Sequence, residues 1–250
     1  MLKNAAIATL ILSSTALATT LPAHALTIAG YDFGATGFET LNATTTDSNV
    51  TASPFGTSGV IATPNSPRPD GFAAGVNGQG TLHNDWALNP TLIDPNKYYT
   101  FTVTPNAGIS MSLNLLTFAA RRSSFGPQNI AVRSSVDNYA ATLSTLTPGT
   151  PNSNSATNDF NTGLSTNLSG AAFENLATAV TFRIYGYGAS NTGGTLRLDN
   201  VILDGTTQAA VPVPFGFTPI WGIAANGVVF GLRKLRNKQM KSGFQSSVKA

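Results

Sequence analysis

The chain has 250 residues, of which only 10% are charged, against roughly 25% in an average soluble domain. It contains no cysteine, which excludes disulfides, thiolate nucleophiles and cysteine-ligated zinc. Residues 26–210 carry seven basic and eleven acidic side chains, a net charge of −4, so the formal +3 of the whole chain comes from its ends and no nucleic-acid partner is expected.

The first 25 residues have the three parts of a secretory signal peptide. Lys3 supplies a positive start, residues 5–21 form an apolar run rich in small residues, and residues 23–25 (Ala-His-Ala) match the A-x-A cleavage pattern. The alternative, an uncleaved membrane anchor, calls for a longer apolar run. We therefore expect export by the secretion machinery and a mature protein that begins at Leu26.

Alternation of apolar and polar residues predicts strands along much of residues 26–210, because successive side chains of a strand point to opposite faces. The alternation is strongest in residues 99–104 and 109–115, which flank a Pro-Asn-Ala-Gly turn and are predicted to form a hairpin. Further strands are expected at residues 26–33, 38–45, 59–63, 130–136, 180–187 and 195–203.

Two segments dense in Asn, Thr, Gly and Pro, residues 64–80 and 148–167, are expected to be loops. A short helix is expected at residues 170–176. Since each predicted strand has one apolar face that another sheet must cover, we expect an all-β, antiparallel two-sheet sandwich with a jelly-roll-like topology.

The predicted ligand-binding residues are Asp85, Trp86, Arg183, Tyr185 and Tyr187. Asp85 and Trp86 lie in a predicted turn, while Arg183 and the two tyrosines share one face of a predicted strand. Sugars stack on exposed aromatic rings, and carboxylate and guanidinium groups bind their hydroxyls. The alternative is that this strand face packs beneath a loop or meets solvent.

Asp32 and Asp199 are the predicted ligands of a structural calcium ion. Hard oxygen ligands suit calcium, and a cysteine-free exported domain is stabilised by such an ion. In their chain positions the two aspartates are similar to calcium-binding residues of carbohydrate-binding jelly rolls, and that resemblance alone selects them.

Arg121 and Arg122 are adjacent on a predicted strand and therefore point to opposite faces. We expect one of them to pair with Asp137 or Asp199 and hold neighbouring strands in register. The alternative is that they bind a carboxylate or sulfate, since arginine presents a bidentate fork.

Enzymatic activity is not expected. After signal cleavage His83 is the only histidine, so a Ser-His-Asp arrangement depends on it alone. Glu39 and Glu174 are the only glutamates, and nothing in the sequence selects a pair of carboxylates for glycoside hydrolysis.

Residues 211–236 combine a proline-containing motif, an apolar run and a basic cluster. Residues 211–232 contain no charged side chain, and about 20 apolar residues can span the hydrocarbon layer of a membrane. The basic cluster that follows marks the cytoplasmic side. We therefore expect a C-terminal transmembrane helix followed by a basic cytoplasmic tail at residues 237–250. The alternative is a buried strand or hairpin of the core.

This order of parts resembles the PEP-CTERM sorting signal that exosortase-type enzymes handle, in its cyanobacterial subclass. The residues that carry the resemblance are Val213, Pro214, Phe215, Phe217, Pro219, Arg233, Lys234 and Arg236. The resemblance implies a sorting protease of the exosortase type as a partner. Residues 118–127, 133–137 and 195–201 are also similar to β-sandwich domains common in PEP-CTERM-type exported proteins, which implies a fold and a location outside the cell.

The expected organisation is a signal peptide (1–25), a β-sandwich ectodomain (26–210), a sorting and transmembrane segment (211–236) and a basic tail (237–250). The expected function is that of a non-catalytic structural or adhesive component of the cell envelope, cell surface or extracellular matrix. The alternative is a carbohydrate-binding module acting on extracellular polysaccharide.

Overall fold

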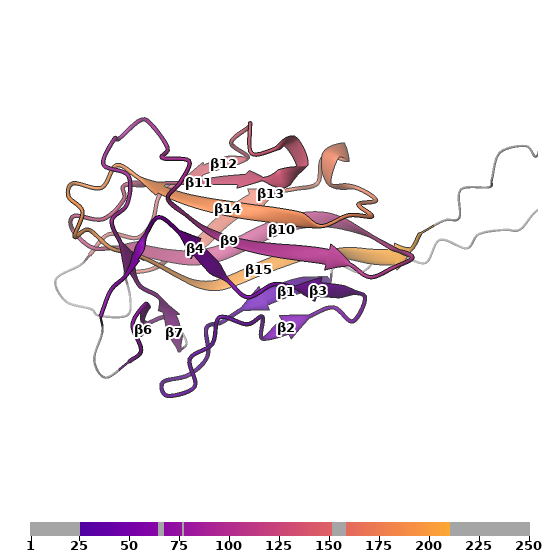
Figure 1. Ribbon diagram of the computed structural model, residues 1–250, viewed down its shortest axis with the longest axis horizontal. Helices are drawn as coiled ribbons and strands as arrows, with labels where there is room; N and C mark the ends of the chain where they lie inside the picture. The colour runs from indigo at the N-terminus through magenta and orange to yellow at the C-terminus, as the bar shows by residue number, and fades with distance from the viewer. Residues whose placement is uncertain (1–25, 65–67, 77, 152–158, 211–250) are drawn as a thin grey trace, which may run out of the picture. The chain divides into compact units, whose positions relative to one another are not determined.

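The computed structural model describes residues 26–64, 68–76, 78–151 and 159–210. Regular structure in these residues is β-strand, apart from two short 3₁₀ helices, η1 (Ser135–Asp137) and η2 (Ala171–Phe173). Two antiparallel sheets pack face to face as a sandwich (Figure 1). The expectation of an all-β sandwich is confirmed, while the jelly-roll-like topology stays a prediction.

The first sheet has the strand order β13–β10–β15–β1–β2, with β8 beside β15 and β5 beside β8. Its strands are β1 (Leu26–Tyr31), β2 (Thr45–Thr46), β5 (Ile61–Ala62), β8 (His83–Asn84), β10 (Ile109–Arg122), β13 (Asn161–Asn167) and β15 (Leu196–Ala209).

The second sheet has the order β12–β11–β14–β9–β3, with β4 also beside β9. Its strands are β3 (Val50–Ala52), β4 (Gly56–Ser58), β9 (Tyr98–Pro105), β11 (Asn129–Ser134), β12 (Ser144–Leu146) and β14 (Val180–Tyr187). A separate hairpin of β6 (Phe72–Ala74) and β7 (Gln79–Thr81) lies next to β15.

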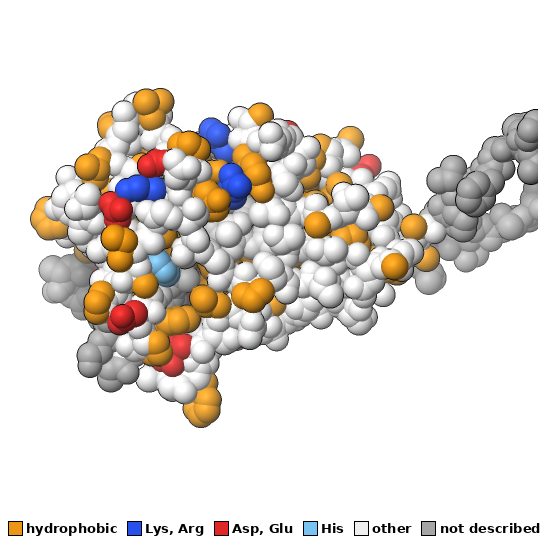
Figure 2. All heavy atoms as spheres, in the orientation of Figure 1, with side chains coloured by type: hydrophobic (Ala, Val, Ile, Leu, Met, Phe, Trp, Pro, Cys, Tyr) orange, Lys and Arg blue, Asp and Glu red, His pale blue; other side chains and the backbone are white. Residues whose placement is uncertain are grey.

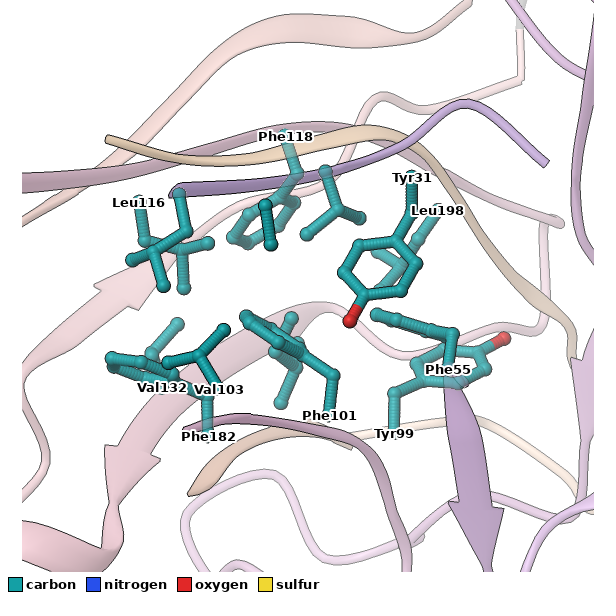
Figure 3. Packing of buried hydrophobic residues seen from close by; sticks show 14 of the residues in the cluster. Tyr31, Phe55, Tyr99, Phe101, Val103, Leu116, Phe118, Val132, Phe182 and Leu198 are labelled. Carbon is teal, nitrogen blue, oxygen red and sulfur yellow. The ribbon is translucent and has the colours of Figure 1, made fainter. Parts of the chain in front are cut away.

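The core lies between the two sheets and is rich in aromatic rings (Figure 3). Phe101 of β9 stacks on Phe182 of β14 at a centroid distance of 5.4 Å, and Phe55 lies 5.9 Å from the Phe101 ring. Leu116 and Phe118 of β10 are buried on the facing sheet. Burial of each such side chain contributes about 1.5–3 kcal/mol, so the alternating strands are held by the apolar faces they share.

The predicted hairpin of residues 99–104 and 109–115 is wrong. The two strands exist, as β9 and β10, but they belong to opposite sheets: β9 pairs with β14, and β10 pairs with β13 and β15. The turn between them, with Gly108 at φ +76°, carries the chain from one sheet to the other. In a hairpin the two apolar faces would lie side by side, whereas here they face each other across the core.

The two predicted loops also contain strands. Residues 64–80 include β6 and the start of β7, and residues 148–167 include the edge strand β13. Only Leu164 and Thr166 of β13 are buried, so its sequence shows little apolar periodicity. In the predicted strand at residues 38–45, only Thr45 is in a strand, and the predicted helix at 170–176 is the single turn η2.

No helix among the described residues is long and apolar enough to cross a membrane. The predicted signal peptide (1–25), the sorting and transmembrane segment (211–236) and the basic tail (237–250) lie outside the described residues and stay predictions.

Candidate functional site

The outward face of the second sheet carries arginines and tyrosines in register. Tyr185 on β14 lies opposite Ala131 on β11 and Tyr98 on β9. Two residues along β14, Arg183 lies opposite Arg133 on β11. This face holds three of the five predicted ligand-binding residues, Arg183, Tyr185 and Tyr187, because alternate residues of the strand, such as Ile184, point into the core. Figure 2 shows one face of the molecule, on which charged side chains are few.

Aromatic rings hold Arg183 in place on this face. Its guanidinium carbon lies 4.4 Å from the centroid of the Tyr98 ring and 3.7 Å from that of Tyr139, within the range of a cation–π contact. Tyr139 belongs to the segment that follows η1, where Asn138 and Tyr139 both have a positive φ. The segment therefore folds back over the sheet and covers Arg183, and Tyr185 is buried beneath its neighbours.

Arg133 binds the same segment by hydrogen bonds. Its Nη1 donates to the Tyr139 carbonyl (3.0 Å), and its Nε donates to the Thr142 hydroxyl (3.1 Å). Its guanidinium carbon lies 5.8 Å from the centroid of the Tyr185 ring. These contacts fix the plane of the Arg133 guanidinium.

A cleft of about 440 Å³ opens beside Arg133, within the range of about 300–1,000 Å³ typical of small-molecule sites. One wall is residues 91–95, and the other walls come from β11, β12, β14 and Thr142. The lining residues are Thr91, Leu92, Ile93, Pro95, Ala131, Arg133, Thr142, Thr145 and Tyr187. Tyr187 is half-buried, so part of its ring faces the cleft, while Arg133 is the single charged side chain among the lining residues.

Asn89 shapes the wall formed by residues 91–95. Its side-chain oxygen accepts hydrogen bonds from the backbone N–H groups of Thr91 (2.8 Å) and Leu92 (3.0 Å). The turn leaves the Leu92 side chain 63% exposed at the cleft. Neither this wall nor the role of Arg133 is predictable from the sequence, because the alternation around Arg133 does not indicate which loop lies opposite it.

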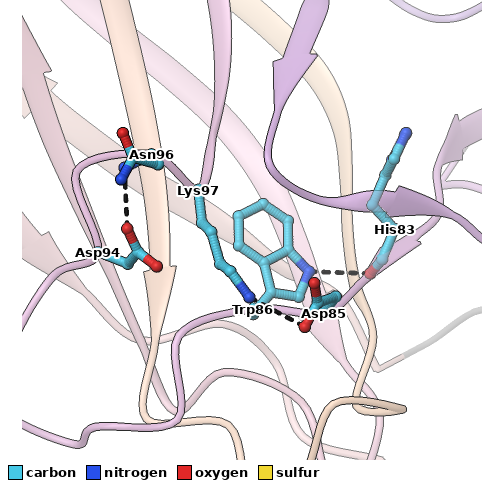
Figure 4. A network of polar contacts seen from close by, with 6 residues as sticks. All are labelled: His83, Asp85, Trp86, Asp94, Asn96 and Lys97. Atoms are coloured by element: carbon cyan, nitrogen blue, oxygen red, sulfur yellow. Dashed lines mark hydrogen bonds and ion pairs between the residues drawn. The ribbon is translucent and has the colours of Figure 1, made fainter.

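Trp86 and Asp85 do not join the tyrosine face. Trp86 is fully buried, and its indole N–H donates to the His83 carbonyl at 2.8 Å (Figure 4). Asp85 has a positive φ and pairs with Lys97 at 2.9 Å. Trp86 and Lys97 border a second depression, of about 290 Å³, on residues 86–97. The expectation that Trp86 offers an exposed ring to a sugar therefore does not fit its position.

His83 takes part in a buried network that joins the two sheets. Its Nδ1 lies 3.2 Å from the Tyr99 hydroxyl, which donates to the Leu196 carbonyl (3.0 Å) and accepts from the Thr81 hydroxyl (3.1 Å). Burial lowers the pKa of His83 to about 4 and raises that of Tyr99. His83 is therefore neutral at physiological pH, and the contact between its Nδ1 and the Tyr99 hydroxyl holds β8 against β9.

The structure places Asp32 and Asp199 in different settings. Asp32 is exposed, accepts a hydrogen bond from the Gly34 N–H (3.0 Å), and borders a depression of about 170 Å³ together with Asn200. Asp199 is buried, and its carboxylate accepts from the N–H groups of Val76 and Asn200. No group of three or more His, Asp or Glu side chains suited to a metal ion occurs in the described part of the chain. The calcium site stays a prediction.

An ion pair joins Arg121 to the segment before β13, while the expected pairing with Asp137 or Asp199 stays a prediction. The Nη2 of Arg121 lies 3.4 Å from the Asp159 carboxylate, which precedes the edge strand β13. Arg122 instead donates to the carbonyls of the turn after β10, including that of Ser124 at 3.1 Å. Arg121 thus holds neighbouring segments together, as expected of one of the two arginines. Its partner Asp159 was not predicted, because it belongs to residues 148–167, a segment predicted to be a loop.

No protein-family model and no curated protein sequence matches the chain. Among solved structures, the chain is similar to the K1 cleaved adhesin domain of Lys-gingipain (Kgp) from Porphyromonas gingivalis W83. The TM-score is 0.33 and the sequence identity 15%, over 66% of this chain and 95% of that domain. A TM-score of this size does not establish a common fold.

Proposed function

We propose that the chain is an exported, non-catalytic structural or adhesive component of the cell envelope, cell surface or extracellular matrix. The observation that supports it is the agreement between the end of the last described strand and the predicted sorting segment. Strand β15 ends at Ala209, just before that segment, and pairs with β1, which follows the predicted signal peptide. Loss of both predicted segments would leave every described strand of the sandwich whole.

In this proposal the secretion machinery removes residues 1–25, and the apolar run of residues 211–232 halts in the membrane at its basic cluster. A sorting protease of the exosortase type then recognises the motif around Pro214 and releases the sandwich from its tail. The mature protein is left on the envelope or in the matrix. A mildly acidic domain with few charged side chains suits a component that makes many weak contacts in the envelope or matrix.

Mass spectrometry of the mature protein, isolated from its native envelope, tests this proposal. We expect an N-terminus at Leu26 and loss of the basic tail. Replacing Arg233, Lys234 and Arg236 together by glutamine should leave the tail uncleaved or the protein mislocalised. The matched control replaces Lys238, Lys241 and Lys249, which lie beyond the motif. Cytosolic protein that keeps both Met1 and Ala250 would contradict the proposal.

The cleft supports a second candidate, the binding of extracellular polysaccharide. A sugar ring needs an apolar surface for its C–H groups and polar partners for its hydroxyls. The cleft supplies both: Tyr187 and Leu92 offer apolar surface, and the hydroxyls of Thr91 and Thr142 offer polar partners. It replaces the predicted site around Trp86 as the place where a glycan would bind.

Replacing Tyr187 by alanine should weaken glycan binding about tenfold, which corresponds to about 1.4 kcal/mol of lost contact. Binding is measured on an array of extracellular polysaccharides and then by calorimetry. The matched control is Phe38→Ala, which removes a ring that is 81% exposed and does not line the cleft. Equal affinity in the two variants would rule the cleft out as the glycan site.

A further inference from the structure

We infer that the cleft binds a saccharide unit that carries a carboxylate, with Arg133 as the residue that recognises it. The inference rests on the proposed glycan binding and names the ligand class of the same cleft. It depends on the charge of the cleft, on the hydrogen bonds of Arg133 and on the position of Arg183.

The cleft is locally positive, although the domain as a whole is acidic. Arg133 lines it, and none of the other lining residues has an acidic side chain. Asp94 is the acidic residue of the 91–95 wall, but it borders the other depression, and its carboxylate accepts a hydrogen bond from the Asn96 N–H at 3.0 Å. A ligand in the cleft therefore meets one cation and no competing carboxylate on the walls.

Neither arginine of this face forms an ion pair with an acidic residue in the described part of the chain. Arg133 and Arg183 lie directly opposite each other on neighbouring strands, a like-charge arrangement that destabilises a sheet. The rings of Tyr98 and Tyr139 stabilise Arg183 but do not remove its charge. A bound anion would relieve the repulsion between the two guanidinium groups.

The guanidinium of Arg133 is oriented before any ligand arrives. Its Nε and one hydrogen of Nη1 are used by Thr142 and the Tyr139 carbonyl. The other hydrogen of Nη1 and both hydrogens of Nη2 have no acceptor among the described residues. These are the hydrogens that a carboxylate engages end-on in a bidentate pair. Because the group is already fixed, less conformational entropy is lost on binding.

The same observations argue for a single acidic sugar unit over a long polyanion. A polyanion is bound by positive charge spread over a surface, whereas residues 26–210 have a net charge of −4. Arg133 and Arg183, which lie opposite each other, form a locally positive area on this negatively charged domain. A uronic acid offers one carboxylate for Arg133, C–H groups for Tyr187 and hydroxyls for Thr91 and Thr142.

The test uses the mature protein from the native envelope and pairs of short oligosaccharides. Each pair has one oligomer of glucuronic, galacturonic or mannuronic acid and its carboxyl-reduced, neutral counterpart. Affinity is measured by titration calorimetry for the natural protein, Thr145→Glu and Thr145→Gln. Thr145 is exposed, lines the cleft opposite Ala131, and makes no side-chain hydrogen bond within the described residues. The two variants thus differ in charge at one position while the contacts of Arg133 are kept.

We expect at least one acidic oligomer to bind about tenfold or more tightly than its neutral counterpart. Thr145→Glu should abolish this preference, and Thr145→Gln should keep it. If acidic and neutral forms bind equally well, or if Thr145→Glu keeps the preference, the inference about the carboxylate fails while glycan binding stands. If neither form binds to the natural protein or to Thr145→Gln, both the inference and glycan binding at this cleft are overturned.

Discussion

At the scale of single residues, the neutral state of His83 is coupled to the stability of the fold. The imidazole is buried between β8 and β9, and its Nδ1 is 3.2 Å from the Tyr99 hydroxyl. Protonation in place would bury a charge, which costs free energy unless the charge is paired. The folded protein therefore resists protonation of His83 more strongly than the unfolded chain does.

The pH dependence of stability follows from this difference. The pKa of His83 is about 6.5 when unfolded and about 4 when folded, so below pH 6.5 the unfolded chain binds the proton more readily. The contribution of the neutral imidazole is complete above pH 6.5 and is lost as the pH falls to 4. The loss amounts to about 3 kcal/mol at the acidic end.

We expect His83→Gln to lower stability at pH 7.5 but to lose less of it than the natural protein between pH 7.5 and 4.5. Urea unfolding of both proteins at the two pH values measures the difference. The carboxylates titrate in both proteins, so their effect cancels in the comparison. Parallel loss of stability in both proteins would show that His83 does not carry this dependence.

At the scale of elements, two arginines hold the segment of residues 138–142 over the second sheet. Arg183 binds it through the Tyr139 ring and Arg133 through hydrogen bonds to Tyr139 and Thr142. Because Thr142 also lines the cleft, the position of this segment sets the width of the cleft. Local contacts of this kind determine which regions open without global unfolding.

Replacing Arg183 by glutamine should loosen this segment, since a cation–π contact contributes about 0.5–2 kcal/mol depending on its burial. Hydrogen exchange should speed up severalfold at the Ala141 amide, which is bonded to the Asp137 carboxylate, and at the Tyr139 amide. Arg122→Gln, which removes contacts only within its own turn, is the control. Unchanged exchange at residues 138–142 would exclude a role for Arg183 in holding them.

The sequence predicts strands well where one face is apolar over several residues, as in Phe101 and Val103 of β9. It does not predict strand partners, because alternation is the same whether β9 pairs with β10 or faces it across the core. The edge strand β13 was missed for a related reason, since it buries few side chains. Register and sheet order depend on contacts between residues far apart in the chain, as in the pairing of Leu26 with Gly205.

The candidate site was predictable only in part. Period-two alternation placed Arg183, Tyr185 and Tyr187 on one face, and the structure has them there. It did not show that Tyr185 is covered or that Trp86 is buried, because an aromatic residue in a polar turn is compatible with either setting. Arg133 and residues 91–95 come together only in the folded chain, so no local pattern indicates their cleft.

At the scale of the whole sandwich, the cleft and the last residue of β15 lie at opposite ends. Ala209 pairs with Ile109, next to the turn that follows β9, whereas Tyr187 ends β14 beside the start of β9 (Figure 1). At about 3.3 Å per residue, β14 alone spans about 25 Å between these ends. A protein tethered through Ala209 would thus hold its cleft at the distal tip, within reach of polymers that never approach the supporting surface.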